Sequence, residues 1–400
     1  MRLHQRILAQ LQDEPNVLLY GPPGTGKTHA MKSLQNDLVG DDDSTGSEEV
    51  DPGSRFDPDE VKFPFRSETE DDDSDTSEPD FPGEIKTAWM TFHQDTGYED
   101  FILGLRPEPD GVGGVSLKPR AGTLLSLAEH AKEGNTSILF IDEINRANVP
   151  KVFGQFISVM EKDFRLSEDG TRTRDTIGIS LPQVNDGDQI EDPLNGDEFE
   201  ISLPYEFPQN MYIVASMNSL DRSTEPLDSA LMRRFDQIRV FPDYTNLSNQ
   251  LETDYQAESD LPDAEDTTPE ELTVALLYRV NTFLQSTLGE DFQIGEWYFQ
   301  GVIDAPEDER FSELCRVWDG RVIPKLRELY RSREDQLAML LKVDRSDDVV
   351  VDNYPYRRVE IEDEWESAGV REAFEFRPLS ILEDNDARKQ VLHHLATFER

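Results

Sequence analysis

The run Gly21-Pro-Pro-Gly-Thr-Gly-Lys-Thr28 decides the fold of this chain. Its spacing, G-x-x-x-x-G-K-T, is that of a loop whose backbone N–H groups and following helix N-terminus surround a phosphate. The apolar run Val17–Tyr20 before it predicts a buried strand. The stretch after it predicts a helix, whose apolar side carries Ala30, Met31, Leu34 and Leu38.

Strand, loop and helix together predict a site for a nucleoside triphosphate. The residues expected to bind it are Gly21, Pro22, Pro23, Gly24, Thr25, Gly26, Lys27 and Thr28. The Lys27 ammonium is expected to reach the β- and γ-phosphates, and the Thr28 hydroxyl to hold Mg²⁺.

The strongly acidic net charge of the chain limits which source and which partners are expected. Its 400 residues include 84 acidic and 39 basic side chains, a net charge of −45. Such a surface repels itself unless salt screens it, which favours a halophilic source over an ordinary cytosolic protein with acidic inserts. The acidic surface argues against broad capture of nucleic acid and leaves room for a local basic pore in an oligomer.

The single cysteine, Cys315, fits a reducing cytoplasm, and no apolar run is long enough for a membrane span.

Strands that alternate with helices predict a five-stranded parallel sheet covered on both faces, an α/β fold. The expected strands are 17–20, 85–92, 137–141, 211–216 and 237–241, and the expected helices between them include 120–133 and 149–162. We predict an α/β nucleotide-binding domain over residues 1–245. A smaller helical lid domain over 246–342 is expected to follow it.

Three segments depart from this pattern. Residues 37–84 are rich in Asp, Ser and Pro and predict a mobile acidic insert. Residues 165–205 predict a hairpin insert that carries further acids at 185–199. Residues 343–400 mix a strand-like Val349-Val-Val351 with a helical stretch at 384–399, and form a C-terminal extension with no assigned role.

A second motif follows the loop by about 115 residues. The apolar run Ile138-Leu-Phe-Ile141 ends in Asp142 and Glu143, the pattern of a Walker B strand. Asp142 is expected to join Thr28 at the Mg²⁺ ion, and Glu143 to polarise the attacking water as general base.

Further polar residues lie between the fourth and the fifth predicted strands. Asn218 follows the strand 211–216, and its amide is expected to lie beside Asp142 in the sheet and to orient the water. Arg233 and Arg234 end a short predicted helix, and one of them is expected to act on a neighbour's γ-phosphate. The sequence leaves open which arginine does so. A residue that acts in trans also predicts an oligomer.

In this order and spacing the motifs resemble an AAA+ ATPase module, and further runs resemble the McrB family, the NTPase motor subunits of modified-cytosine-dependent restriction systems. The resemblance covers roughly residues 5–45 and 85–340. The runs that carry it are Thr91–Pro107, Ile141–Asn148 with Phe153-Gly154, Met217–Ser223, Gln293–Phe299 and Ile323-Pro324.

The resemblance implies a ring-forming, Mg²⁺-dependent nucleoside triphosphatase, a hexamer, that hydrolyses ATP or GTP and drives an McrC-like nuclease. The family's preference for GTP makes Asp221 a candidate reader of guanine. The chain departs from the family at Ser219-Leu220 and in its two acidic inserts. With the loop starting at residue 21, no DNA-reading domain is expected before it, so DNA would be engaged only indirectly or through the pore.

Two alternatives stay open. One is a remodelling chaperone of the MoxR or dynein-related kind, which uses the same chemistry on a protein complex. The other is a nucleotide-gated scaffold with little turnover, against which Glu143 argues.

Overall fold

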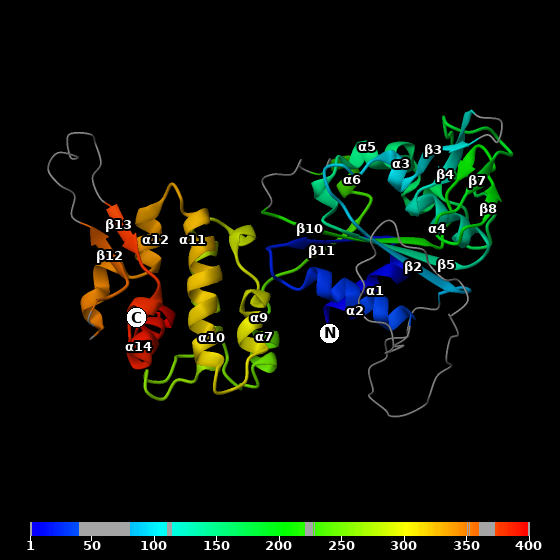
Figure 1. Ribbon diagram of the computed structural model, residues 1–400. Coiled ribbons are helices and arrows are strands. Elements are labelled where there is room, and N and C mark those ends of the chain that lie inside the picture. Colours follow the sequence, from blue (N-terminus) through cyan, green and yellow to red (C-terminus); the bar gives the residue numbers. More distant parts are fainter. Residues whose placement is uncertain are drawn as a thin grey trace, which may run out of the picture. The chain divides into compact units, whose positions relative to one another are not determined.

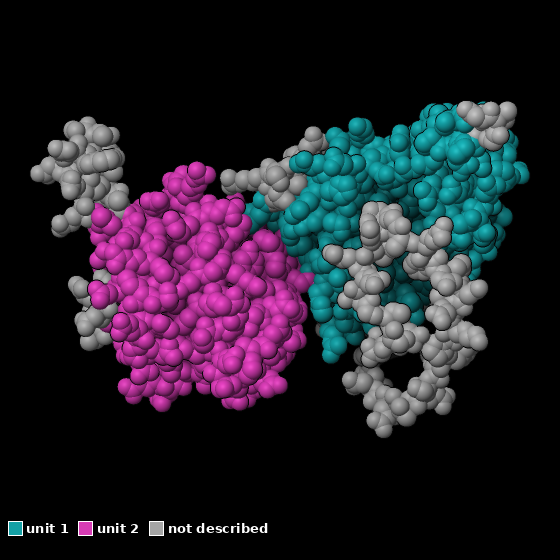
Figure 2. All heavy atoms as spheres, in the orientation of Figure 1, with its two compact units in different colours: residues 1–20, 27–239 teal, residues 21–26, 240–400 magenta. Residues whose placement is uncertain are grey.

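The computed structural model describes residues 2–39, 81–109, 114–220, 227, 229–349, 351, 353–359 and 373–398. The chain forms two compact units: residues 1–20 with 27–239 are unit 1, and residues 21–26 with 240–400 are unit 2 (Figure 2). Most of the predicted insert 37–84 lies outside the described residues. Unit 2 contains both the predicted lid and the predicted C-terminal extension, and the division between those two remains a prediction.

Unit 1 is built on the five-stranded parallel sheet that the sequence predicts. The strands follow the order β11-β1-β10-β5-β2. Their bounds are β1 Asn16–Gly21, β2 Ile85–Thr91, β5 Thr136–Asp142, β10 Met211–Asn218 and β11 Asp236–Arg239. The parallel register pairs Ala215 of β10 with Ile141 of β5, and Thr91 of β2 with Asp142 of β5. The carboxyl ends of β5 and β10 therefore meet at one edge.

Helices cover both faces of this sheet, as its apolar central strands require. In Figure 1, α1 and α2 lie on one face and α4 lies on the other. Leu18 of β1 and Leu139 and Ile141 of β5 are fully buried in the resulting core. The bounds of the helices in unit 1 are α1 Leu3–Asp13, α2 Lys27–Val39, α3 Tyr98–Phe101, α4 Thr123–Lys132, α5 Val149–Phe153 and α6 Ser229–Met232.

Two parts of unit 1 differ from the sequence prediction. The helix expected over 149–162 is only α5 followed by a 3-10 turn over residues 154–159, because Gly154 adopts a left-handed φ of 51°. The segment 165–205 is no single hairpin. Its strand β6 pairs with β9 and its strand β7 with β8, both antiparallel, and β7 extends a further hairpin, β3–β4, that the sequence did not predict. Their bounds are β3 Leu103–Pro109, β4 Val115–Ala121, β6 Gly178–Ile179, β7 Gln189–Glu191, β8 Glu198–Glu200 and β9 Tyr205–Glu206.

Unit 2 is mainly helical, and one buried cluster runs through residues 247–396. The indole of Trp318, for example, donates a hydrogen bond of 2.8 Å to the Tyr356 hydroxyl inside this core. Val349 and Val351 lie outside any strand, and a hairpin, β12–β13, forms after them. The helices and strands of unit 2 are α7 Tyr244–Gln250, α8 Pro269–Thr287, α9 Gln300–Ile303, α10 Arg310–Val317, α11 Ile323–Leu329, α12 Glu334–Leu340, β12 Tyr356–Val359, β13 Ala373–Phe376 and α14 Asn385–Ala396.

Over the described ranges, the structure has no helix with the length and apolarity that a membrane crossing needs. Cys315 is buried as a free thiol, and burial raises its pKa to about 12.

Candidate functional site

The phosphate-binding sequence forms a turn between β1 and α2. Gly24 and Gly26 adopt φ values of 77° and 75°, which side chains rarely tolerate, so the loop can only turn this way with glycine at both positions. The Thr25 hydroxyl donates to the carbonyl oxygen of Pro22 over 3.0 Å. Lys27, the first residue of α2, is buried with only 6% of its surface exposed.

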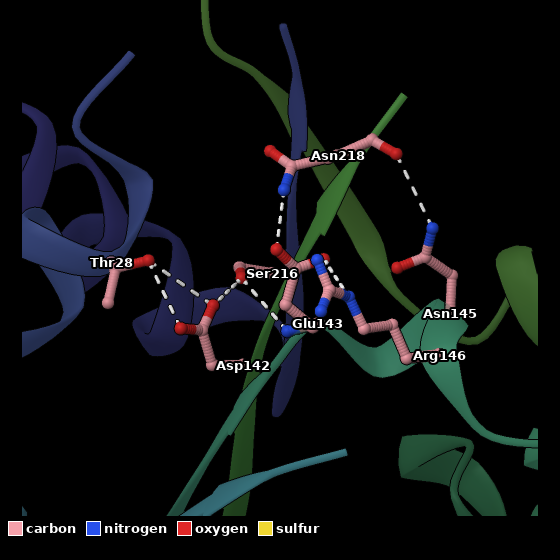
Figure 3. A network of polar contacts seen from close by, with 7 residues as sticks. All are labelled: Thr28, Asp142, Glu143, Asn145, Arg146, Ser216 and Asn218. Atoms are coloured by element: carbon pink, nitrogen blue, oxygen red, sulfur yellow. Dashed lines mark hydrogen bonds and ion pairs between the residues drawn. The ribbon is translucent and has the colours of Figure 1, made fainter. Parts of the chain in front are cut away.

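Two oxygen-bearing side chains meet where α2 begins and β5 ends. The Thr28 hydroxyl lies 3.3 and 3.2 Å from the two carboxylate oxygens of Asp142, which ends β5 (Figure 3). The Ser216 hydroxyl of β10 donates to Asp142 from the other side. A hydroxyl and a carboxylate placed together are the hard oxygen donors that Mg²⁺ prefers, so these residues fit the ion that the sequence predicts.

Glu143 leaves the sheet in an unusual backbone conformation. Its φ is 55°, in the left-handed region that costs a residue with a side chain free energy. Its backbone N–H donates to the Ser216 hydroxyl over 3.4 Å, and its carboxylate lies in the polar network of Figure 3. In this conformation the carboxylate points away from Asp142, so the two adjacent acids face different partners.

Both oxygens of the Glu143 carboxylate have a positively polarised neighbour. The side-chain amide of Asn218 donates to Oε1 over 2.5 Å, and the Arg146 guanidinium lies 3.5 Å from Oε2. Asn145 in turn donates to the backbone oxygen of Asn218 over 3.4 Å. Asn218 thus lies beside Glu143 at the edge where β5 and β10 end. The sequence prediction had placed its amide beside Asp142.

The two arginines behind α6 have different surroundings. Arg234 is held within unit 1: its guanidinium pairs with Glu161 over 3.2 Å, its side chain is 10% exposed, and its backbone oxygen accepts from Asn16 over 3.0 Å. Its Nη1 also donates to the backbone oxygen of Ala230. Arg233 is exposed. A residue that acts on a neighbouring molecule must be exposed, and Arg233 meets this condition.

Ser216, Asn145 and Arg146 join the site without having been assigned a role from the sequence. Ser216 could have been found, because it follows Ala215, whose partner in the register is Ile141, and so lies next to Asp142. Asp221, the candidate reader of guanine, lies outside the described residues.

The described residues hold no cluster of three or more His, Cys, Asp or Glu side chains that would bind a metal unaided. Mg²⁺ in nucleotide sites takes one or two protein ligands together with substrate phosphates and water. The Thr28–Asp142 pair is consistent with that arrangement.

Comparison with known proteins gives the domain class of the central part of the chain. Residues 84–235, from just before β2 to just after α6, match the AAA domain of the dynein-related subfamily. The chain therefore carries an AAA domain, in agreement with its five-stranded parallel sheet.

Two curated relatives narrow this class. The chain is 31% identical over 242 residues to the Type IV methyl-directed restriction enzyme EcoKMcrB subunit of Escherichia coli K12, which is 60% of this chain and 38% of that protein. It is 35% identical over 100 residues to the Type II restriction enzyme BsuMI component YdiS of Bacillus subtilis 168, which is 24% of this chain and 25% of that protein. The resemblance to McrB is confirmed, although the chain spans less than two fifths of either relative.

A solved candidate ATPase of Cytophaga hutchinsonii covers 83% of the chain, and 66% of its own length is matched. Its sequence identity is 14% and its TM-score is 0.28, too low to carry an inference.

Proposed function

We propose that this chain is a nucleoside triphosphatase, the McrB-like motor subunit of a restriction complex, that hydrolyses ATP or GTP. The observation that carries the proposal is the contact between Thr28 and Asp142. It brings the end of the phosphate-binding sequence to the end of β5, where Glu143 follows.

Each residue at this edge has a task in the proposed reaction. The loop amides and Lys27 would bind the phosphates, and Thr28 and Asp142 would hold Mg²⁺. When bound, Mg²⁺ would neutralise negative charge on the β- and γ-phosphates. Glu143 would take a proton from the water that attacks the γ-phosphorus, while the bond from that phosphorus to the β–γ bridging oxygen breaks. Asn218 would hold the Glu143 carboxylate toward that water.

We assign the trans-acting role to Arg233 rather than Arg234. Arg234 is held by Glu161 and contributes to the packing of unit 1, whereas Arg233 is exposed. A guanidinium supplied from a neighbour stabilises charge on the transferring phosphoryl group. The proposal therefore includes a ring of this chain, taken to be a hexamer, with the McrC-like nuclease as a separate partner.

The match to the dynein-related AAA subfamily favours one second function, the remodelling of a protein complex. The chemistry at Glu143 would be the same and the client would differ. Purification from the native host distinguishes the two, since a nuclease subunit supports the restriction motor and a non-nuclease protein complex supports remodelling.

The experiment that tests the proposal measures phosphate release from ATP and from GTP side by side, with and without DNA. Molar salt is the appropriate condition for a chain of net charge −45. We expect Mg²⁺-dependent release from at least one nucleotide, and its loss in Lys27→Ala. Absence of release from both nucleotides, in the presence of the purified partner, would contradict the proposal.

A further inference from the structure

Residues 293–298, which we call the clamp segment, lie against the loop 21–26 within unit 2. The backbone N–H of Gly295 donates to the carbonyl oxygen of Pro23 over 3.0 Å, and the N–H of Trp297 donates to that of Gly24 over 3.0 Å. The Thr25 hydroxyl donates to the Pro22 carbonyl oxygen. The three consecutive carbonyl groups of Pro22, Pro23 and Gly24 therefore each accept a hydrogen bond.

The contact leaves no room for an added side chain. A Cβ atom on Gly295 would lie 1.9 Å from the carbonyl oxygen of Gly24. One on Gly24 would lie 2.7 Å from Cδ2 of Tyr298, and one on Gly26 would lie 2.6 Å from Nε1 of Trp297. Gly295 has no left-handed φ, so space and not backbone conformation requires glycine there.

The clamp segment is itself fixed to the core of unit 2. The side chain of Asn281, on α8 and fully buried, makes two hydrogen bonds of 2.8 Å to the backbone of Ile294, one as donor and one as acceptor. Glu296, 3% exposed, accepts from the backbone N–H of Asp243 over 3.2 Å. The clamp segment is therefore positioned by the helical core before any ligand binds.

We propose that the clamp segment presets the loop 21–26 in its phosphate-binding shape, with Gly295 and Trp297 as positioning residues. The inference rests on the proposed nucleotide binding. Loop amides can face a phosphate only when the carbonyls of the same peptide units turn the other way, and the clamp segment holds two of those carbonyls. A loop ordered in advance does not lose this conformational freedom on binding, so its affinity is higher. Because Asn281 of α8 holds the clamp segment at Ile294, it would also contribute to nucleotide affinity.

A pair of glycine substitutions tests the proposal. Gly295→Ala inserts a methyl group into the contact, whereas Gly320→Ala, in the same unit, adds one where no atom lies within 4 Å and no left-handed φ is required. With two hydrogen bonds lost, we expect the dissociation constants of ATP and GTP, measured by calorimetry with Mg²⁺, to rise at least about tenfold in Gly295→Ala. Gly320→Ala should stay within about twofold of the wild type. A dissociation constant for Gly295→Ala within that same range overturns the proposal.

Amide hydrogen exchange of the wild-type protein gives a test that does not depend on the variant folding. Coupling between two sites is reciprocal, so saturating nucleotide should slow exchange at the Gly295 and Trp297 amides by a factor similar to the loss of affinity. Unchanged exchange at both amides overturns the clamp.

The Lys27→Ala variant separates failure of the clamp from failure of the proposed function. If the wild type binds neither ATP nor GTP, both proposals are wrong. Only the proposed role of the clamp segment is wrong if the wild type and Gly295→Ala bind nucleotide equally well and Lys27→Ala does not bind it.

Discussion

The side-chain amide of Asn218 donates a hydrogen bond of 2.5 Å to the carboxylate of Glu143. Asn218 ends β10, and Glu143 comes directly after β5, the neighbouring parallel strand. Glu143 reaches this contact through a left-handed backbone, so its direction is fixed by both its main chain and its partner. A general base must be held toward the water that it activates. The contact therefore makes Asn218 a determinant of the rate of the proposed reaction.

Replacing Asn218 by alanine should slow hydrolysis without weakening nucleotide binding. We expect the rate of phosphate release at saturation to fall about 10- to 100-fold, because the Glu143 carboxylate loses its orienting donor. The dissociation constant should stay within about threefold. Steady-state kinetics with parallel calorimetry measures both, and Asn249→Ala, at an exposed position on α7, is the control. Loss of affinity with an unchanged rate would contradict this role.

Substitution of the two adjacent arginines should separate stability from catalysis. Arg234→Ala removes the ion pair with Glu161 and should lower the free energy of unfolding of unit 1 by about 1–3 kcal/mol. Arg233→Ala, at an exposed position, should change the free energy of unfolding by less than about 0.5 kcal/mol. It should reduce hydrolysis by the proposed ring about 10³-fold or more.

Thermal melts and phosphate release, measured on both arginine variants, test this assignment. In mixtures of Arg233→Ala with Glu143→Gln chains, some activity should return at interfaces that combine an intact arginine with an intact glutamate. A variant pair with the two effects exchanged would show that Arg234 is the trans-acting residue.

Glu296 should make the stability of unit 2 depend on pH. Burial raises the pKa of its carboxyl from 4.5 to about 7, although hydrogen bonds such as the one from the Asp243 backbone N–H act in the opposite direction. A group whose folded pKa is raised stabilises the folded state below its unfolded pKa, and this contribution is lost as pH rises through the folded value. We therefore expect wild-type stability to fall between about pH 4.5 and pH 7 relative to Glu296→Gln, and to change no further above this window.

The Glu296 prediction is checked with urea unfolding of both proteins at several pH values in constant salt. A shift of this size corresponds to about 3 kcal/mol across the full window, and a smaller measured difference is expected because the buried site relaxes. Identical pH profiles of the two proteins would show that Glu296 does not titrate in this range.

The parts of unit 1 that could be predicted from the sequence are those that contain a motif with fixed residue types and spacing. The phosphate loop and the Asp142-Glu143 pair need set residue types at set spacings, so they could be located and placed at strand ends. The register of β5 against β10 then brings Asn218 close to these acids. The contact of Arg234 with Glu161 could not be predicted, because it joins segments that only the folded chain brings together.

The hairpin β3–β4 was missed for a physical reason. Pro107, Pro109 and Pro119 lie in its strands, and proline cannot donate to a sheet ladder. Leu105, Val115 and Leu117 are exposed on it, so the hairpin also lacks a clear alternation of buried and exposed side chains. In the sequence, the residues of the clamp segment indicate only a family resemblance. Their contact with the loop 21–26 could not be predicted, because it depends on tertiary packing.

Phosphate release by the wild type and by Glu143→Gln, with nucleotide affinity measured on both, tests whether Glu143 is the general base. Glutamine keeps the size of the side chain and can still accept from Asn218, but it cannot take a proton from water. We expect the rate at saturation to fall at least about 100-fold, with the dissociation constant within about threefold. Equal rates for the two proteins would remove Glu143 as the catalytic base and contradict the account.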